Sequence, residues 1–340
     1  MSLPLSVLDL SPVSSGSTGA QALRNTLELA RLADRLGFTR YWLAEHHNIP
    51  TIASTAPEVM IAHVASITER IRVGSGGIML PNHAPLRIAE EFRVLQALHP
   101  GRIDLGIGRA PGTDMLTALA LRRSKERLSV NDFPEQLAEL IGFGTGRFPE
   151  KSPFASIQAL PADVNLPPIW ILGSGEDGAR LAAEMGFPFA HAHHFSPDYT
   201  VPAMRLYRHR FKPSVWLKEP KSIVTTSVVC AESDEEAERL AASLELSWVR
   251  LRTGHPAPLP SPEEALAYHY SPIEEEIARY ARRIRIAGAP IKVRKQIEAL
   301  AAETLADEVM ITSMIYDHAA RIRSYELVAD VFGLQGYQGE

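Results

Sequence analysis

The chain has 340 residues, of which 45% are hydrophobic and 22% charged, and its formal net charge is −5. This is ordinary globular composition, and the absence of a basic excess argues against nucleic acid as a partner. A single cysteine excludes an intrachain disulfide, no apolar stretch reaches the roughly 18 residues that span a bilayer, and the first residues lack a signal-peptide pattern. We therefore expect a cytoplasmic protein with neither a membrane nor a nucleic-acid partner.

Short apolar runs alternate with helical patterns through the first third of the chain. Thr18 is a candidate cap for the first helix, and Gly37 ends it. Alternation with short connections is typical of parallel βαβ units. The predicted strands are 5–10, 41–44, 71–80 and 102–108, and the predicted helices are 20–36, 56–68 and 85–98.

The alternation loosens after residue 109 and then resumes. Eight strands, each followed by a helix apart from local insertions, favour a (β/α)8 TIM barrel over an open sheet. We expect one domain, 1–340, with insertions over the carboxyl-terminal face at about 110–130, 143–165 and 253–288, the last a candidate lid. The later strands are 168–173, 187–191, 222–231 and 307–312, and the later helices are 132–142, 176–185, 197–211, 233–250, 290–303 and 317–332.

Strand 41–44 ends in three titratable residues, Glu45, His46 and His47. Such groups are costly to bury unless something uses them, and barrels bind ligands at the carboxyl ends of their strands. Composition alone leaves a second interpretation, a surface loop that happens to contain histidine. The other strand ends decide between the two.

Two further strand ends are rich in glycine. Gly74, Gly76 and Gly77 interrupt one strand, which indicates either a flat ligand against the main chain or a tight bend that the barrel needs. The next strand ends in Gly108-Arg109, and arginine is a fixed cation suited to phosphate or carbonyl oxygens.

Strand 168–173 runs into Gly173-Ser174-Gly175-Glu176-Asp177-Gly178 and a helix. This G-x-G-x-x-G pattern offers free main-chain N–H groups at a helix N-terminus, which is an anion site. A dinucleotide fold would place an acidic residue at the end of the following strand, but that strand continues into His191, His193 and His194. The pattern therefore predicts a phosphate site and not an NAD site.

These strand ends together provide an anion cradle, a fixed cation, glycines for a flat ring and several histidines. A phosphorylated aromatic cofactor such as FMN matches all four. The candidate cofactor-binding residues are Gly76, Gly77, Arg109, Gly173, Ser174, Gly175, Gly178 and His194.

The sequence resembles the luciferase-like flavin monooxygenases, the family of the bacterial luciferase subunits, and is most similar to their non-luminescent group-1 members. Light-emitting members have a cysteine where Gly108 stands in this chain, which argues against luminescence. The turn at Ser174 has fewer hydroxyl groups than is common in the family. The stretches that carry the resemblance are 37–47, 73–81, 101–109, 170–174 and 316–321.

The resemblance implies a barrel with FMN at the carboxyl ends of its strands and a non-prolyl cis peptide near Gly76-Gly77 under the flavin ring. His46 matches the catalytic histidine, Arg109 a flavin-contacting arginine, and Ser174 with Gly175 the phosphate-binding turn. Reduced FMN from a separate NAD(P)H:FMN reductase would react with O2 to a C4a-hydroperoxide that oxygenates an aldehyde, ketone or similar carbon. His46, titrating near neutrality beside Glu45, would act as general base or proton donor. We further expect a homodimer.

Three alternatives remain at this point. The first is a metal-dependent barrel hydrolase whose ligands come from Glu45, His46, His47, His191, His193 and His194. The second is an oxidoreductase of the same barrel family that uses the deazaflavin F420. The third is a family member that binds no flavin and only assembles with partners.

Several other conspicuous residues have structural interpretations. Trp170 is expected in the core, and Cys230 is expected to be a buried strand residue. His83, His99 and His269 are expected at the surface or at helix caps.

Overall fold

The computed structural model of the protein describes residues 3–124, 132–148 and 152–336. Its strands pair in parallel throughout the main sheet. The strands are β1 (Leu5–Asp9), β2 (Arg40–Leu43), β3 (Arg72–Ser75), β4 (Ile78–Met79), β5 (Ile103–Gly108), β6 (Ile169–Gly173), β7 (Phe189–Ala192), β8 (Ser222–Cys230), β9 (Arg285–Gly288) and β10 (Glu308–Thr312).

The sheet closes into a barrel because β10 pairs with β1 on one side and with β8 on the other. Around the ring the order is β1, β2, β3 with β4, β5, β6, β7, β8 and β10. The predicted TIM barrel is therefore confirmed.

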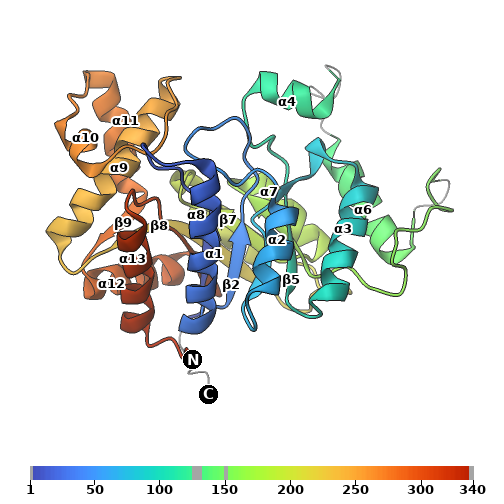
Figure 1. Cartoon of the computed structure of the whole chain (residues 1–340). Coiled ribbons are helices and arrows are strands. Elements are labelled where there is room, and N and C mark those ends of the chain that lie inside the picture. The colour runs from blue at the N-terminus through green and yellow to red at the C-terminus, as the bar shows by residue number, and fades with distance from the viewer. Residues whose placement is uncertain (1–2, 125–131, 149–151, 337–340) are drawn as a thin grey trace.

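Helices surround this barrel (Figure 1). Helices α4, α10 and α11 lie beyond one end of it, on the side opposite to the chain termini. The helices are α1 (Gly19–Leu36), α2 (Pro57–Ser66), α3 (Pro85–Leu98), α4 (Met115–Arg122), α6 (Phe133–Thr145), α7 (Glu176–Met185), α8 (Thr200–Arg210), α9 (Asp234–Arg252), α10 (Pro262–Ala267), α11 (Pro272–Arg283), α12 (Pro290–Thr304) and α13 (His318–Phe332).

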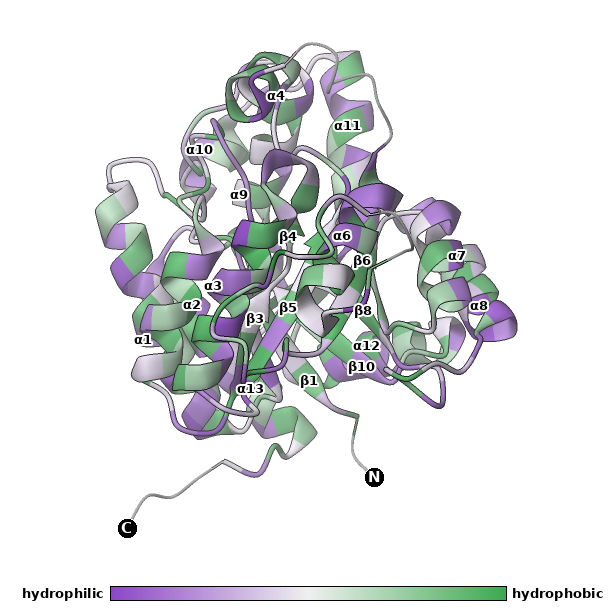
Figure 2. Ribbon diagram, turned by 90° about the vertical axis from the view of Figure 1, so that its right-hand side faces the viewer, coloured by the Kyte–Doolittle hydropathy of each residue, from purple (hydrophilic) through white to green (hydrophobic). Residues whose placement is uncertain are grey.

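Strand residues alternate between the helix layer and the barrel interior. In β2, Tyr41 and Leu43 join the large core between strands and helices, whereas Trp42 belongs to a smaller cluster inside the barrel with Trp170. Helices such as α7 and α8 carry both hydrophobic and hydrophilic residues (Figure 2), as expected for helices with one buried face. Trp170 is a core residue, as predicted.

An ion-pair network fills the amino-terminal end of the barrel interior. Arg40 Nη1 donates to Asp104 Oδ2 at 2.6 Å, and its Nε donates to Glu308 Oε1 at 2.7 Å. Arg72 also pairs with Asp104, and the guanidinium of Arg40 lies 4.9 Å from the Trp170 ring centroid. Because these partners satisfy one another, the charges close this end of the barrel and leave the opposite end for ligands.

The prediction of a single strand at 71–80 is wrong. It divides into β3 and β4 because it has one residue more than its neighbour: Val73 pairs with Ile103, but Ile78 pairs with Ile107. The extra residue forms a bulge at Gly76-Gly77, and the peptide bond between these glycines is cis, as the resemblance implied.

The segment 253–288 is more regular than a loop, because it contains α10, α11 and β9. Strand β9 was not predicted. It pairs with Ser227–Cys230 of β8, and within this stretch only Ser227 is also paired with β10. The predicted insertion 110–130 contains α4, and its residues 125–130 lie outside the described residues, as do residues 149–151 of the insertion 143–165.

Cys230 is buried in β8, as predicted, and burial raises the pKa of its thiol to about 12. Among the described residues, no helix combines the length and apolarity needed to cross a membrane.

Candidate active site

A cavity of about 1290 Å³ opens at the carboxyl ends of the barrel strands. Leu8, Trp42, Ala190 and Met310, which point into the barrel, line its inner end. Ligand pockets usually measure about 300–1,000 Å³, so this cavity has room for a cofactor and a second small molecule. The predicted site residues that line it are His46, Gly76, Arg109, Gly173, Ser174, Gly175, Gly178 and His194.

The three titratable residues after β2 have different environments. The carboxylate of Glu45 is fully buried and receives hydrogen bonds from His47 and His83 instead of His46. His46 lines the cavity, and its Nδ1 atom is buried with no hydrogen-bond partner among the described residues. A buried polar atom without a partner is costly, so this atom is a candidate contact for a bound ligand.

The expectation that His46 titrates near neutrality is wrong. Burial lowers the pKa of His46 to about 4, although the charge of Glu45 raises it in part. The imidazole is therefore neutral at pH 7, with a proton on one ring nitrogen and a lone pair on the other.

The glycines between β3 and β4 are required by close packing. A Cβ atom on Gly76 would lie 2.6 Å from Leu8 Cδ1, and one on Gly77 would lie 2.7 Å from the Gly106 carbonyl oxygen. Gly76 also lines the cavity, but Gly77 is not among the lining residues. The bend that the barrel needs accounts for Gly77, whereas Gly76 serves both the bend and the cavity wall.

The turn between β6 and α7 combines tight packing with open space. Gly173 and Gly178 allow α7 to approach β6, since a Cβ on Gly173 would lie 3.3 Å from Gly178 Cα. Gly175 is different, because a Cβ there would meet no atom within 4 Å. Gly175 is the N-cap of α7 and makes no side-chain capping bond, so the first N–H groups of the helix are available to an anion.

Arg109, after β5, reaches toward this turn. Its side chain is 56% exposed, and its Nη1 atom lies 3.8 Å from Asp177 Oδ2 in the first turn of α7. The cation thus lies near the predicted anion site, and a carboxylate lies there as well. Such an exposed pair is weak, so an anionic ligand could displace Asp177 from Arg109.

The histidine in β7 and the two that follow the strand do not form a single group. His194 lines the cavity, and burial lowers its pKa to about 3. His191 Nε2 lies 3.3 Å from the Ser196 carbonyl oxygen, and His193 Nδ1 lies 2.9 Å from Thr200 Oγ1.

Within the described residues, no three His, Cys, Asp or Glu side chains are arranged to bind a metal ion. The six donors proposed for a metal-dependent hydrolase are therefore not brought together.

Sequence reasoning missed His83 and Asn82 as site residues. His83 is the C-cap of the 3-10 helix η1 (Leu80–Asn82), so the expectation of a capping residue is confirmed, but its Nε2 atom also lies 3.0 Å from both carboxylate oxygens of Glu45. No sequence pattern links residues 45 and 83, since only the pairing of β2 with β3 brings their loops together.

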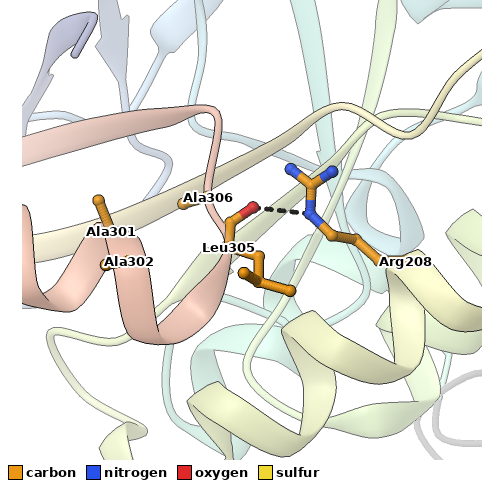
Figure 3. Close-up of a pocket in the computed structure, with 5 residues that line it drawn as sticks. All are labelled: Arg208, Ala301, Ala302, Leu305 and Ala306. Carbon is orange, nitrogen blue, oxygen red and sulfur yellow. Dashed lines mark hydrogen bonds between the residues drawn. The ribbon is translucent and has the colours of Figure 1, made fainter.

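A second, shallower hollow lies far from this site, between α8 and the end of α12 (Figure 3). Its volume is about 470 Å³. Arg208 Nε donates to the Leu305 carbonyl oxygen there at 2.6 Å, and alanines form most of the remaining lining. The guanidinium of Arg208 is already paired with Asp307, so the hollow offers little chemistry to a ligand.

A TIM barrel with a large cavity at the carboxyl ends of its strands is the usual scaffold of an enzyme. The sequence matches the luciferase-like monooxygenase family over residues 3–308. The chain belongs to this family and is therefore a flavin-dependent oxidoreductase of the monooxygenase type.

Curated relatives match over nearly the full length. The uncharacterized protein YvbT of Bacillus subtilis is 48% identical over 96% of both chains. A luciferase-like monooxygenase of Escherichia coli is 43% identical over 97% of both chains. The N-acetyl-S-alkylcysteine monooxygenase of Bacillus subtilis is 34% identical over 96% of this chain and 97% of its own.

Solved structures agree with the fold. The structure of apo-MsnO8 has a TM-score of 0.90 at 39% identity and covers 99% of both chains. The oxygenating constituent of 3,6-diketocamphane monooxygenase from Pseudomonas putida, in complex with FMN, has a TM-score of 0.73 at 19% identity over the whole of both chains. An F420-dependent secondary alcohol dehydrogenase has a TM-score of 0.66 at 14% identity, covering 98% of this chain and 99% of that one. The last two similarities concern the fold alone.

Proposed function

We propose that the protein binds reduced FMN in the cavity and uses O2 to oxygenate a small organic substrate, such as an aldehyde, ketone or thioether. The observation that carries this proposal is the combination, in one cavity wall, of the open space at Gly175, the uncapped start of α7 and the unpartnered Nδ1 of His46. An anion and a ring system with polar edges would satisfy these features together.

The phosphate end of the cofactor would be held by the turn after β6. Ser174 and Gly175 would offer a hydroxyl and main-chain N–H groups, and Gly173 and Gly178 keep the start of α7 close to the strand. Arg109 would add a charge-assisted hydrogen bond once the phosphate replaces Asp177 as its partner.

The ring end would lie over the bend at Gly76 and Gly77. The apolar residues at the inner end of the cavity would keep water away from it. His194 lines the same cavity as His46, and its pKa is lowered to about 3 by burial and, to a smaller extent, by the charge of His46, so its ring is neutral near pH 7.

Reduced flavin supplies the electrons that allow one atom of O2 to enter the substrate and the other to leave as water. The role proposed for His46 is to hold a proton at one ring nitrogen and to accept one at the other, close to the reacting atoms. With a pKa of about 4, it is a weak base and acts chiefly as a neutral hydrogen-bond donor and proton relay.

The reduced flavin would come from a separate NAD(P)H:FMN reductase. The β6–α7 turn has a dinucleotide-like glycine pattern, but β7 ends in Ala192 and is followed by histidines, with no acidic residue to bind a ribose. This supports a cavity that binds a mononucleotide flavin and not NAD(P)H.

The proposal is tested by supplying the protein with FMN, a flavin reductase, NADH and isotopically labelled O2. The substrate panel contains an aliphatic aldehyde, a cyclic ketone and an N-acetyl-S-alkylcysteine, the last because a 34% identical relative bears that name. Incorporation of one labelled oxygen atom into a product supports the proposal. Two-electron reduction of O2 to hydrogen peroxide with every substrate and no labelled product, or activity with F420 in place of FMN, would count against it.

A further inference from the structure

Glu45 is the centre of a buried polar cluster behind the cavity wall. Its Oε2 accepts a hydrogen bond from the Met79 main-chain N–H at 2.8 Å, and its Oε1 accepts bonds from His47 Nε2 at 2.9 Å and from Asn82 Nδ2 at 3.2 Å. His83 Nε2 lies 3.0 Å from both oxygens. The carboxylate therefore has four partners and no contact with water.

These bonds connect three loops that follow different strands. Glu45 and His47 follow β2, whereas Met79 and His83 lie at and just after the end of β4. Asn82 connects the loop after β5 to the same cluster, because its Nδ2 also donates to the Pro111 carbonyl oxygen at 2.9 Å.

Main-chain bonds complete the connection. The His47 N–H donates to the Gly112 carbonyl oxygen at 3.1 Å, and the His46 N–H donates to that of Ser54 at 3.0 Å. Of the two cavity-lining residues, Met79 is thus held directly by its main-chain bond to Glu45, and His46 is held by its own main-chain bond and through its neighbours Glu45 and His47.

Glu45 and His83 each favour the charged form of the other. Burial alone would raise the pKa of Glu45, but the bonds from His47 and His83 lower it to about 2. Burial would likewise lower the pKa of His83, but its bond to Glu45 and the charges of Glu45, Glu58 and Glu91 raise it above 6.5. Glu58 on α2 and Glu91 on α3 are thus the charged groups that face His83 from the helix layer.

We propose that Glu45 and His83 form an ion pair that acts as a positioning element for the active site, holding His46 and Met79 in place against the bound flavin and substrate. This inference rests on the proposed function. Neither residue of the pair touches the cavity, because neither lies among the residues that line it. Their effect on the reaction therefore passes through the residues beside them.

The pair makes the site sensitive to alkaline pH. His83 is protonated in the folded state at pH values where an ordinary histidine, with a pKa of 6.5, is already neutral. Its contribution to stability is complete below about pH 6.5 and is lost as the pH rises through its higher folded-state pKa. The organisation of the loops around His46 should weaken over the same interval.

Two variants separate charge from hydrogen bonding. Glu45→Gln removes the carboxylate and points amide hydrogens toward groups that are themselves donors. His83→Gln keeps a donor near the position of Nε2 but cannot titrate. Glu245→Gln is the matched control, because Glu245 is a buried carboxylate that pairs with Arg282 and Arg285 away from the cavity.

Three readouts are measured for each variant: the histidine titrations by NMR in the flavin-free protein, the dissociation constant of FMN, and the pH dependence of the rate at which O2 reoxidises bound reduced FMN. In the wild type we expect the raised pKa of His83, and this titration should be absent from His83→Gln and shifted to lower pH in Glu45→Gln. FMN affinity should change less than about threefold, because the phosphate end is untouched.

The reoxidation rate should change by on the order of 10-fold to 100-fold in Glu45→Gln, as expected when reacting groups are displaced by about 1 Å. The wild-type reoxidation rate should change as the pH rises into the alkaline range, and this change should be absent from His83→Gln. Glu245→Gln should lower thermal stability and leave both properties as in the wild type.

Two results would overturn the inference while leaving the proposed function intact: an unchanged rate and pH profile in Glu45→Gln, or an equal change in Glu245→Gln. A wild-type protein that binds no FMN would overturn both proposals. Circular dichroism and melting temperatures verify that each variant is folded, and His83→Gln provides the test if Glu45→Gln does not fold.

Discussion

Replacement of Gly175 by aspartate should change stability and flavin affinity in opposite directions. Gly175 is the N-cap of α7, it has an extended backbone with φ of −164°, and a side chain there would meet no atom within 4 Å. Aspartate is a preferred N-cap residue, so the new carboxylate in Gly175→Asp would accept hydrogen bonds from the first N–H groups of α7. Those are the groups that we propose for the phosphate of FMN.

The magnitudes follow from charge and exposure. Aspartate in place of glycine at an N-cap gains a few tenths of a kcal/mol, and the helix dipole adds about 0.3–1 kcal/mol. Two like charges about 5 Å apart repel by about 3 kcal/mol at an effective dielectric constant of about 20. Gly175 is partly exposed, so water and salt screen about half of this repulsion. The remaining repulsion of about 1.5 kcal/mol between the aspartate and the phosphate weakens FMN binding about tenfold.

The assay compares FMN with riboflavin, which lacks the phosphate. The FMN dissociation constant of Gly175→Asp should rise about tenfold while that of riboflavin stays constant, and the melting temperature should not fall. Gly175→Asn is the matched control, because asparagine caps the helix in the same space without a charge, and it should weaken FMN binding much less.

An unchanged affinity of Gly175→Asp for both flavins would refute the placement of the phosphate at this turn. Equal weakening of both flavins would instead indicate that the turn contacts the ring system.

Three further predictions concern single side chains. His46→Asn should bind FMN within about threefold of the wild type but lose on the order of 100-fold in oxygenation rate; undiminished oxygenation would exclude a role for His46 in the reaction. Asp177→Asn removes the carboxylate that lies 3.8 Å from Arg109, so FMN should bind several-fold more tightly, and weaker binding in the titration would contradict this arrangement. Burial lowers the pKa of His191 to about 4, so between pH 4 and 6.5 the unfolded chain binds the extra proton and the free energy of unfolding falls as the pH falls. Urea unfolding should show a loss of roughly 1 kcal/mol from this residue near pH 5.5, and the loss should be absent in His191→Gln.

The barrel could be predicted from the sequence because its signal is local and repeated. Each apolar run followed by a helical pattern indicates one βα unit, and eight of them imply closure. The convergence of His46, Arg109 and Ser174 on one cavity was predictable for the same reason, since the carboxyl ends of parallel strands meet at one edge.

Other features depend on contacts between distant segments and left no local signal. Glu45 bonds to His83, 38 residues away, and not to the adjacent His46. The low pKa of His46 results from burial by several loops, which no sequence pattern encodes. Strand β9 was missed because its partner is the end of an unusually long β8.

The most direct test of the account is an anaerobic titration of the purified protein with FMN, oxidised and reduced, followed by the absorbance of the flavin. We predict saturable binding of one FMN per chain, with a perturbed flavin spectrum and higher affinity than for riboflavin. A flavin spectrum that stays unchanged in both oxidation states, with the protein in excess, would contradict the central claim that this cavity is a flavin site.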